Sequence, residues 1–208
     1  TFLSPALQQP IRLGADYVIH STTKYLNGHS DVVGGAVVAA DPADLQQLVW
    51  WANCLGTTGS PFDAYLTLRG VRTLYPRIER QQATAGIVAA FLDAHPAVKV
   101  VHYPGLESHP SHELAKRQQT GFGAMLSFEL DGGRDAVRAF IEALDVFTLA
   151  ESLGGVESLI AHPATMTHAA MAPEAQRTAG IVEGLLRLSI GLEHEQDVLR
   201  DLTRALDS

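Results

Sequence analysis

The sequence predicts an α/β protein in which helices cover one face of an open β-sheet. Two segments, residues 124–130 and 186–190, alternate large apolar side chains with other residues, a period of two that is typical of strands with one buried face. Residues 134–144 carry apolar side chains at helical spacing, so this helix has one apolar stripe. A striped helix beside half-buried strands favours a layered arrangement, because each element covers the apolar face of the other.

In the first part of the chain, the β-favouring residues 17–19 predict a strand, which hydroxyl residues interrupt just before Lys24. A short buried strand is expected over residues 35–40. Asp41 and the proline after it then begin a helix that should run to about Leu55. We expect the two adjacent tryptophans of this helix to pack in the protein core.

A serine N-cap followed by proline begins a long helix over residues 60–95, with a bend near Gly70 or at residues 75–76. The strand and helix units after this bend form a second pattern. We therefore place a domain boundary at the bend, which gives residues 1–75 and 76–208 as two domains.

The second domain should also contain a strand over residues 98–103, a short helix over residues 109–119 and a final amphipathic helix. The apolar stripe of the final helix is formed by Val198, Leu199, Leu202, Ala205 and Leu206.

The composition argues against several classes of protein. A net charge of -8 without a basic stripe disfavours a nucleic-acid partner, because phosphate binding relies on clustered Lys and Arg. No apolar run reaches the roughly 18 residues of a membrane span, and the single cysteine, Cys54, permits no intrachain disulfide. A cytoplasmic protein is the simplest interpretation. Because Thr1 is neither an initiator methionine nor the start of a signal peptide, we interpret the sequence as beginning mid-protein.

The histidines and glycines do not form a metal or nucleotide motif. His112 and His194 each precede a glutamate, but neither is followed by the second histidine that a zinc-binding helix needs. Gly121 and Gly123 are followed by Leu126 where a dinucleotide fingerprint has its third glycine. We therefore expect neither a metal site nor a nucleotide site.

Lys24 is the main candidate for chemistry, because it lies at the end of an apolar strand. Apolar neighbours desolvate an amine there and lower its pKa from about 10.4, which is what carbonyl chemistry requires of a lysine. The hydroxyls of Ser21 and Thr23, three residues and one residue before it, are placed to hold a phosphate.

Two other interpretations of this segment stay open from the residues alone. Ser21 to Lys24 also fits the S-x-x-K pattern of acyl-serine enzymes, with Ser21 as nucleophile, although the supporting S-D-N and K-T-G motifs are missing. So short a motif most often marks only a solvent-exposed lysine in a turn.

Residues 151–155 and Arg187 are weaker candidates. The adjacent glycines Gly154 and Gly155 let backbone amides approach an anion, but most such turns only reverse the chain. Arg187 alternates with aliphatic residues in its strand, which turns it away from the core and is also compatible with a solvent-facing arginine or an ion pair.

Several stretches together resemble the cysteine and methionine metabolism family of pyridoxal-phosphate (PLP) enzymes. They are HSTTKYLNGHSDVVGG, WWANCLGTTGSPFDAYLTLRGVRTL, GFGAMLSFEL, LAESLGGVESLIAHPATMTHA and LLRLSIGLE, and they extend across nearly all of the chain. The resemblance implies the C-terminal portion of a fold-type-I transferase: the end of a large cofactor domain, followed by a smaller α+β domain.

The resemblance also implies the roles of individual residues. Lys24 would form the Schiff base with PLP, while Ser21 and Thr23 would bind the cofactor phosphate. On the substrate side, Arg187 and Ser152 would hold the α-carboxylate. Two further residues would lie near the substrate: Glu151, facing the entering amino acid, and Asn53.

The chemistry that the resemblance implies is γ-replacement, in which O-succinylhomoserine condenses with cysteine. The alternative within the family is γ-elimination from cystathionine or methionine. The partners would be amino-acid substrates and further copies of the same chain in a homotetramer. A non-catalytic binding or regulatory module remains a possibility of another class, because part of the family's cofactor pocket lies upstream of Thr1.

Overall fold

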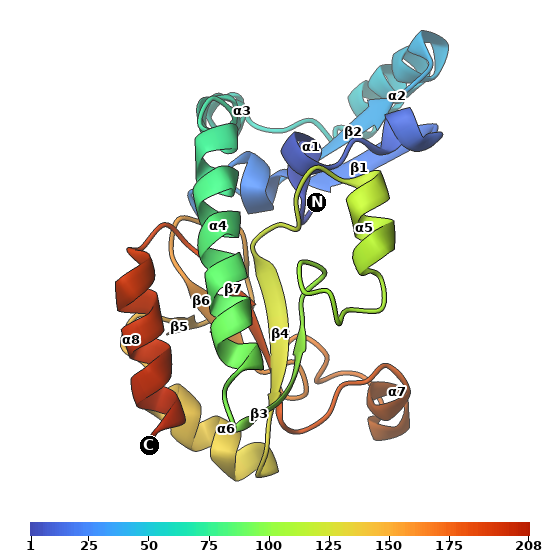
Figure 1. Ribbon diagram of the computed structural model, residues 1–208. Helices are drawn as coiled ribbons and strands as arrows, with labels where there is room; N and C mark the ends of the chain where they lie inside the picture. The colour runs from blue at the N-terminus through green and yellow to red at the C-terminus, as the bar shows by residue number, and fades with distance from the viewer.

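The computed structural model describes residues 1–208 and contains two separate sheets, with three helices between them in the sequence (Figure 1). The smaller, two-stranded sheet lies near the N-terminus, and the larger sheet has five strands. The elements of the N-terminal part are α1 (Ser4–Leu7), η1 (Pro10–Leu13), β1 (Tyr17–Ser21), η2 (Thr22–Leu26), β2 (Gly35–Ala39) and α2 (Pro42–Leu55).

Strands β1 and β2 pair antiparallel, with Tyr17 opposite Ala39 and Ser21 opposite Gly35. Both strands were expected, but β2 is not buried, since Val37 and Val38 are each 46% exposed. The reason is that this sheet has only two strands, and the other elements packed against β2 are α2 and η2.

Helix α2 begins and ends where the sequence predicts. Asp41 caps it by accepting a hydrogen bond from the Ala43 amide at 2.7 Å, and its last helical residue is Leu55. The expectation that its tryptophans are buried was wrong, because Trp50 is 57% and Trp51 46% exposed. No residue of α2 is buried, since the helix projects away from the larger sheet (Figure 1).

Two separate helices, α3 (Pro61–Val71) and α4 (Leu74–Asp93), replace the single bent helix that was expected. The break lies at Thr73, whose backbone is not helical and whose hydroxyl donates a hydrogen bond to the Gly70 carbonyl at 3.1 Å. Sequence reasoning placed the bend within a few residues of this break. The domain boundary at residues 75–76 stays a prediction.

The larger sheet has the strand order β3-β4-β7-β6-β5, and every pair is antiparallel except β5 with β6. Its strands are β3 (Val98–His102), β4 (Met125–Leu130), β5 (Thr148–Leu149), β6 (Leu159–Ala161) and β7 (Leu185–Ser189). The remaining helices are α5 (His112–Gln118), α6 (Gly133–Glu142), α7 (Pro173–Thr178) and α8 (Glu195–Leu206).

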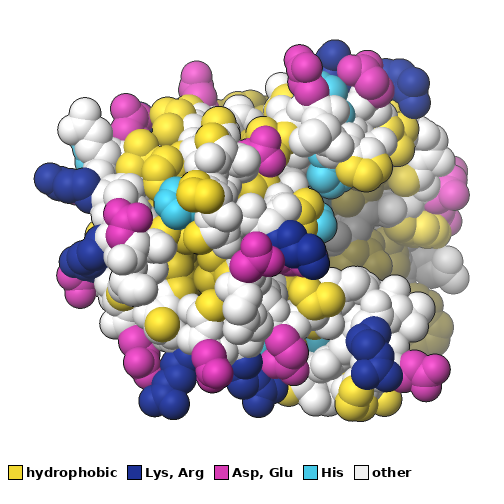
Figure 2. All heavy atoms as spheres, turned by 60° about the horizontal axis from the view of Figure 1, so that its bottom comes forward, with side chains coloured by type: hydrophobic (Ala, Val, Ile, Leu, Met, Phe, Trp, Pro, Cys, Tyr) yellow, Lys and Arg dark blue, Asp and Glu magenta, His cyan; other side chains and the backbone are white.

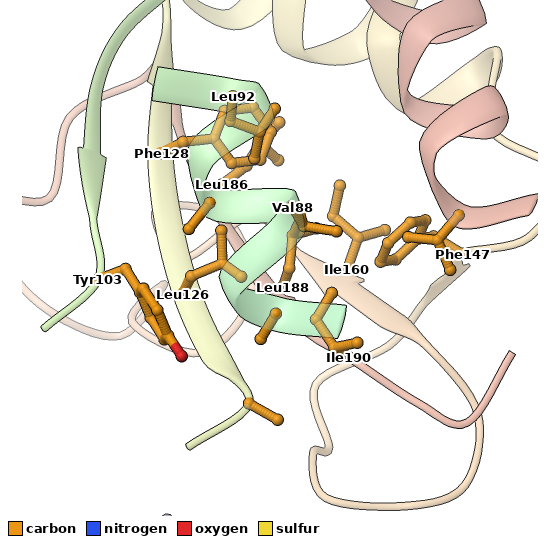
Figure 3. Packing of buried hydrophobic residues seen from close by; sticks show 14 of the residues in the cluster. Val88, Leu92, Tyr103, Leu126, Phe128, Phe147, Ile160, Leu186, Leu188 and Ile190 are labelled. Atoms are coloured by element: carbon orange, nitrogen blue, oxygen red, sulfur yellow. The ribbon is translucent and has the colours of Figure 1, made fainter. Parts of the chain in front are cut away.

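Helices α4, α6 and α8 pack together with one face of this sheet, which confirms the predicted α/β layering (Figure 1). Side chains of α4 meet those of β4, β6 and β7 in the core (Figure 3). The labelled core residues include Val88, Leu92, Phe128, Ile160, Leu186 and Leu188. The opposite face bears a row of aligned residues across four strands, His102, Ser127, Arg187 and Ala161, and it is this face that carries the candidate site.

The surface shows the mixed charge that the composition suggests. On the face drawn in Figure 2, acidic and basic side chains are interspersed, and no continuous basic patch appears. In addition, no helix has both the length and the apolar character needed to cross a membrane.

Candidate active site

Lys24 lies directly after β1, within the short helical segment η2, where its backbone leaves the helical conformation (φ -89°, ψ -134°). Its half-buried side chain reaches across to the larger sheet, and Nζ donates a hydrogen bond to Ser152 Oγ at 3.2 Å. Partial burial and, secondly, the positive charge of Arg187 lower the pKa of the Lys24 amine from its usual 10.5. The expected desolvation of this lysine is therefore present.

Arg187 comes from β7, on the sheet face that points away from α4. Its Nη2 donates hydrogen bonds to two backbone carbonyls, those of Glu151 at 2.7 Å and Ser152 at 3.3 Å. Its Nε and Nη1 atoms make no hydrogen bond within the chain, so these donors are available to a ligand. Burial lowers the pKa of Arg187 from its usual value, although Glu151 opposes the shift.

A cavity of about 350 Å³ lies beside Arg187 on this sheet face. The residues around it combine an apolar wall with a few polar groups, including Leu3, His102, Phe122, Met125, Ser127 and Arg187. A cation at one side of a largely apolar cavity suits a ligand with one carboxylate and an aliphatic chain.

The loop that carries Glu151 and Ser152 is held tightly in place. Gly154 adopts a left-handed conformation (φ +78°), and a Cβ added there would lie 2.9 Å from the Tyr25 amide nitrogen. The Gly154 amide donates to Ser189 Oγ at 2.9 Å, so it is not available to an anion as the sequence had suggested. Gln81, fully buried in α4, donates to the carbonyls of Gly155 at 2.7 Å and Ile190 at 3.0 Å.

The hydroxyls that precede Lys24 differ in their bonding. The Thr23 hydroxyl accepts a hydrogen bond from the Gly34 amide at 3.0 Å, whereas the half-buried Ser21 hydroxyl forms none within the chain. An acyl-serine mechanism needs the lysine amine on the serine hydroxyl. Since Lys24 bonds to Ser152 instead, the geometry disfavours that alternative.

The structure does not bring Asn53 to this group. It lies exposed on α2, its carbonyl accepts from the Gly56 amide at the helix end, and it takes no part in the hydrogen bonds around Lys24 and Arg187. Within the chain it therefore forms part of the helix terminus, as its position near the end of α2 suggests.

Sequence reasoning missed three buried residues around Lys24: Tyr25, Arg77 and Gln81. Tyr25 is fully buried, its hydroxyl has no hydrogen-bond partner, and burial raises its pKa well above the usual value. For Arg77 and Gln81, the only signal in the sequence was their position on the buried face of α4, beside Leu74 and Ile78.

The chain matches the family described as Cys/Met metabolism PLP-dependent enzyme over residues 1–207. The chain belongs to this family, and the resemblance seen in the sequence is confirmed.

The relatives include both synthases and lyases. The chain is 60% identical to cystathionine γ-synthase of Escherichia coli K12, covering 97% of the chain and 52% of that protein. It is 52% identical to cystathionine β-lyase of Lactococcus lactis subsp. cremoris, covering 100% of the chain and 54% of that protein. The chain thus spans about half the length of the curated relatives it matches.

Solved structures confirm the fold class. The crystal structure of cystathionine γ-synthase from Xanthomonas oryzae pv. oryzae, in complex with aminoacrylate and cysteine, aligns with a TM-score of 0.97 and 67% identity. That alignment covers 100% of this chain and 54% of the other. A cystathionine γ-lyase from Micromonospora echinospora aligns with a TM-score of 0.96 and 44% identity, covering 100% of this chain and 55% of the other.

Proposed function

We propose that this chain supplies the lysine and the carboxylate-binding side of a PLP-dependent cystathionine γ-synthase. The reaction would be γ-replacement, in which O-succinylhomoserine and cysteine give cystathionine and succinate in methionine biosynthesis by transsulfuration. The observation that carries this proposal is the convergence of Lys24, Ser152 and Arg187 from distant parts of the sequence. The identities of 60% and 67% to synthases, against 52% and 44% to lyases, favour synthesis over elimination.

The residues present fit PLP. A half-buried lysine with a lowered pKa has more neutral amine at physiological pH than an exposed one, and a neutral amine is what bonds to the aldehyde of PLP. Lys24 would hold the cofactor covalently. The free Ser21 hydroxyl, together with Thr23, would donate hydrogen bonds to its phosphate. When bound, PLP supplies the electron sink for carbanion chemistry at the substrate.

Arg187 and Ser152 would orient the amino-acid substrate. The Nε and Nη1 donors of Arg187, which are unused within the chain, would donate to the α-carboxylate, and this contact fixes which bond at Cα is broken. Glu151, whose carbonyl accepts a hydrogen bond from Arg187, would face the entering amino acid. Asn53 would lie near the substrate only where residues outside this chain complete the site.

Lys24 would also move the protons of the reaction. Its amine, once displaced by the substrate amine, would take the proton from Cα and act again at Cβ. The hydrogen bond from Nζ to Ser152 Oγ would hold the mobile amine on the substrate side of the site. Succinate would leave from Cγ, and the cysteine sulfur would form the new bond at the same carbon.

The complete protein would act as a cytoplasmic homotetramer. The N-terminal part exposes many large apolar side chains, which supports their burial against further polypeptide. They include Ile19, Val49, Trp50, Trp51, Phe62, Tyr65 and Leu68. The oligomeric state is measured by light scattering of the full-length protein, and a monomer would contradict this part of the proposal.

The proposal is tested by supplying purified full-length protein and PLP with O-succinylhomoserine, with and without cysteine. We expect cystathionine when cysteine is present and slower release of a 2-oxo acid and ammonia when it is absent. A dominant 2-oxo acid product from cystathionine would instead support the lyase alternative. Absence of a borohydride-reducible adduct on Lys24 would favour the non-catalytic module.

A further inference from the structure

We propose that Arg77 is a positioning residue that fixes the Lys24 turn, residues 22–28, against the junction of α3 and α4. This inference rests on the proposed function of Lys24. Arg77 lies in the first turn of α4, and it follows Lys24 by 53 positions in the sequence. Its guanidinium lies between the Lys24 turn and the end of α3.

The guanidinium of Arg77 ties three segments together. Its Nη2 donates to the Tyr25 carbonyl at 3.0 Å and to the Gly70 carbonyl at 2.9 Å. Its Nε donates to Thr73 Oγ1 at 3.1 Å. The acceptors therefore belong to the residue directly after Lys24, to the last turn of α3 and to the break between the helices.

The burial of Arg77 shows that this arrangement is not an ordinary ion pair. The residue is 4% exposed, forms no salt bridge with any carboxylate, and its Nη1 has no hydrogen-bond partner. A buried charge without a counter-ion is costly, and an apolar side chain of similar size would fill the same space at lower cost. What arginine adds is a planar group that donates in fixed directions to several acceptors at once.

Two glycines allow the Lys24 turn to approach this group closely. A Cβ on Gly28, whose φ is +72°, would lie 2.0 Å from Arg77 Nη1. A Cβ on Gly70 would lie 2.1 Å from the Asn27 carbonyl oxygen. The guanidinium and the end of α3 therefore pack directly on the backbone of the turn, and neither approach leaves room for a side chain.

The position of the Tyr25 carbonyl matters for chemistry because it is adjacent to Lys24. On the other side, the turn contacts Gly154, and the Lys24 amine bonds to Ser152. Arg77 thus fixes the backbone that carries Lys24, whose side-chain amine must move between the cofactor and the substrate. A small displacement of a reacting group lowers the reaction rate by a large factor. The substrate contacts made by Arg187 should stay in place when Arg77 is changed.

The test compares Arg77→Lys and Thr73→Val with Arg80→Lys in the full-length holoenzyme. Arg80 is a matched control, since it lies one helical turn further along α4, its side chain is 41% exposed, and it pairs with Glu195 at 3.1 Å. Three quantities are measured for each variant: the thermal midpoint, kcat and KM for the amino-acid substrate, and the rate at which apoprotein and PLP form a borohydride-reducible adduct located on Lys24 by peptide mass spectrometry.

For Arg77→Lys we expect kcat and the rate of adduct formation to fall at least about tenfold, with KM changed less than about twofold. Thr73→Val should change the same two rates in the same direction, by about threefold, and it decides the question if Arg77→Lys does not fold. Arg80→Lys should match the wild type in every measurement.

A variant with a lowered thermal midpoint but wild-type kcat and adduct rate per folded molecule would show that Arg77 is only structural, and would overturn the inference. A wild-type protein that forms no adduct on Lys24 would overturn both the inference and the proposed function. Loss of rate in Arg80→Lys equal to that in Arg77→Lys would also overturn it.

Discussion

The Lys24 amine donates a hydrogen bond to the hydroxyl of Ser152, a residue 128 positions further along the chain. This contact joins the end of the two-stranded sheet to the loop that precedes β6 in the five-stranded sheet. The candidate site therefore exists only when both parts of the chain are folded and packed together. Variants of the site should separate effects on chemistry from effects on this packing.

Lys24→Ala should abolish the borohydride-reducible adduct and nearly all turnover while leaving the protein folded. The side chain is half-buried and makes one hydrogen bond, so its removal should change the free energy of unfolding by no more than about 1.5 kcal/mol. Lys99→Ala is the control, because Lys99 is 64% exposed and 3.6 Å from Glu129. Retained turnover in a folded Lys24→Ala protein would contradict the proposed chemistry.

Arg187→Met should raise the pKa of the Lys24 amine. The positive charge of Arg187 disfavours the ammonium form of Lys24, so removing that charge stabilises the protonated amine. Adduct formation with PLP needs the neutral amine and therefore rises with pH. In the wild type its midpoint should lie below 10.5, and in Arg187→Met the midpoint should move upward.

The control for this pH profile is Arg134→Met, which removes an exposed arginine paired with Glu183. Its midpoint should equal that of the wild type. If Arg187→Met leaves the midpoint in place, burial alone lowers the pKa of Lys24 and the two side chains are not coupled.

The strands β4 and β7 and the helices α6 and α8 were predictable because their apolar residues obey a clear period, whereas the short strands β5 and β6 were not predicted. The strand β4 buries every second residue, and helix α8 buries one stripe, so pattern and structure agree. The exposure of Trp50 and Trp51 was not predictable in the same way. An apolar stripe indicates that a helix face is to be covered, but not whether the same 208 residues provide the cover.

The candidate site was predictable at Lys24, which follows the end of an apolar strand, and the family resemblance supplied the roles of Arg187 and the other residues. Arg77 and Gln81 were not predictable, because their partners are backbone carbonyls of distant segments. Backbone acceptors leave no mark in the sequence, whereas an acidic partner would have. The bend predicted near Gly70 or residues 75–76 lies within a few residues of the observed break, where the Thr73 hydroxyl donates a hydrogen bond to the Gly70 carbonyl.

Ser21→Ala and Thr23→Ala should each weaken the affinity for PLP by about 1 to 3 kcal/mol, the cost of losing one hydrogen bond to a charged group. Ser21→Ala is the cleaner test, because the Ser21 hydroxyl has no partner within the chain. Thr23→Ala also loses the bond from the Gly34 amide at 3.0 Å, so Thr23→Ser, which keeps the hydroxyl, is its control. Equilibrium dialysis of PLP measures both, and unchanged affinity in the two alanine variants would remove the phosphate role.

Gly154→Ala should destabilise the protein more than Gly56→Ala, although both glycines have positive φ, +78° and +68°. At Gly56 nothing lies within 4 Å of an added Cβ, so only backbone strain of about 1 to 2 kcal/mol is expected. At Gly154 the Cβ would lie 2.9 Å from the Tyr25 amide nitrogen, which adds an overpacking cost of about 1 to 3 kcal/mol. Chemical denaturation measures the difference. Equal losses would mean that the loop and the Lys24 turn are not in tight contact.

Arg187→Lys should lower kcat/KM by at least about tenfold for every amino-acid substrate, which corresponds to about 1.4 kcal/mol of transition-state stabilisation. The arginine uses Nη2 to hold the carbonyls of Glu151 and Ser152 and keeps Nε and Nη1 free for the carboxylate, and a single ammonium group cannot do both. Because lysine keeps the positive charge, the pH midpoint of adduct formation on Lys24 should stay where it is in the wild type. The combination of a reduced kcat/KM with an unchanged midpoint separates carboxylate binding from the electrostatic effect tested by Arg187→Met. Near-normal kcat/KM in a folded, PLP-loaded Arg187→Lys protein would show that Arg187 only supports the loop and that another group holds the carboxylate.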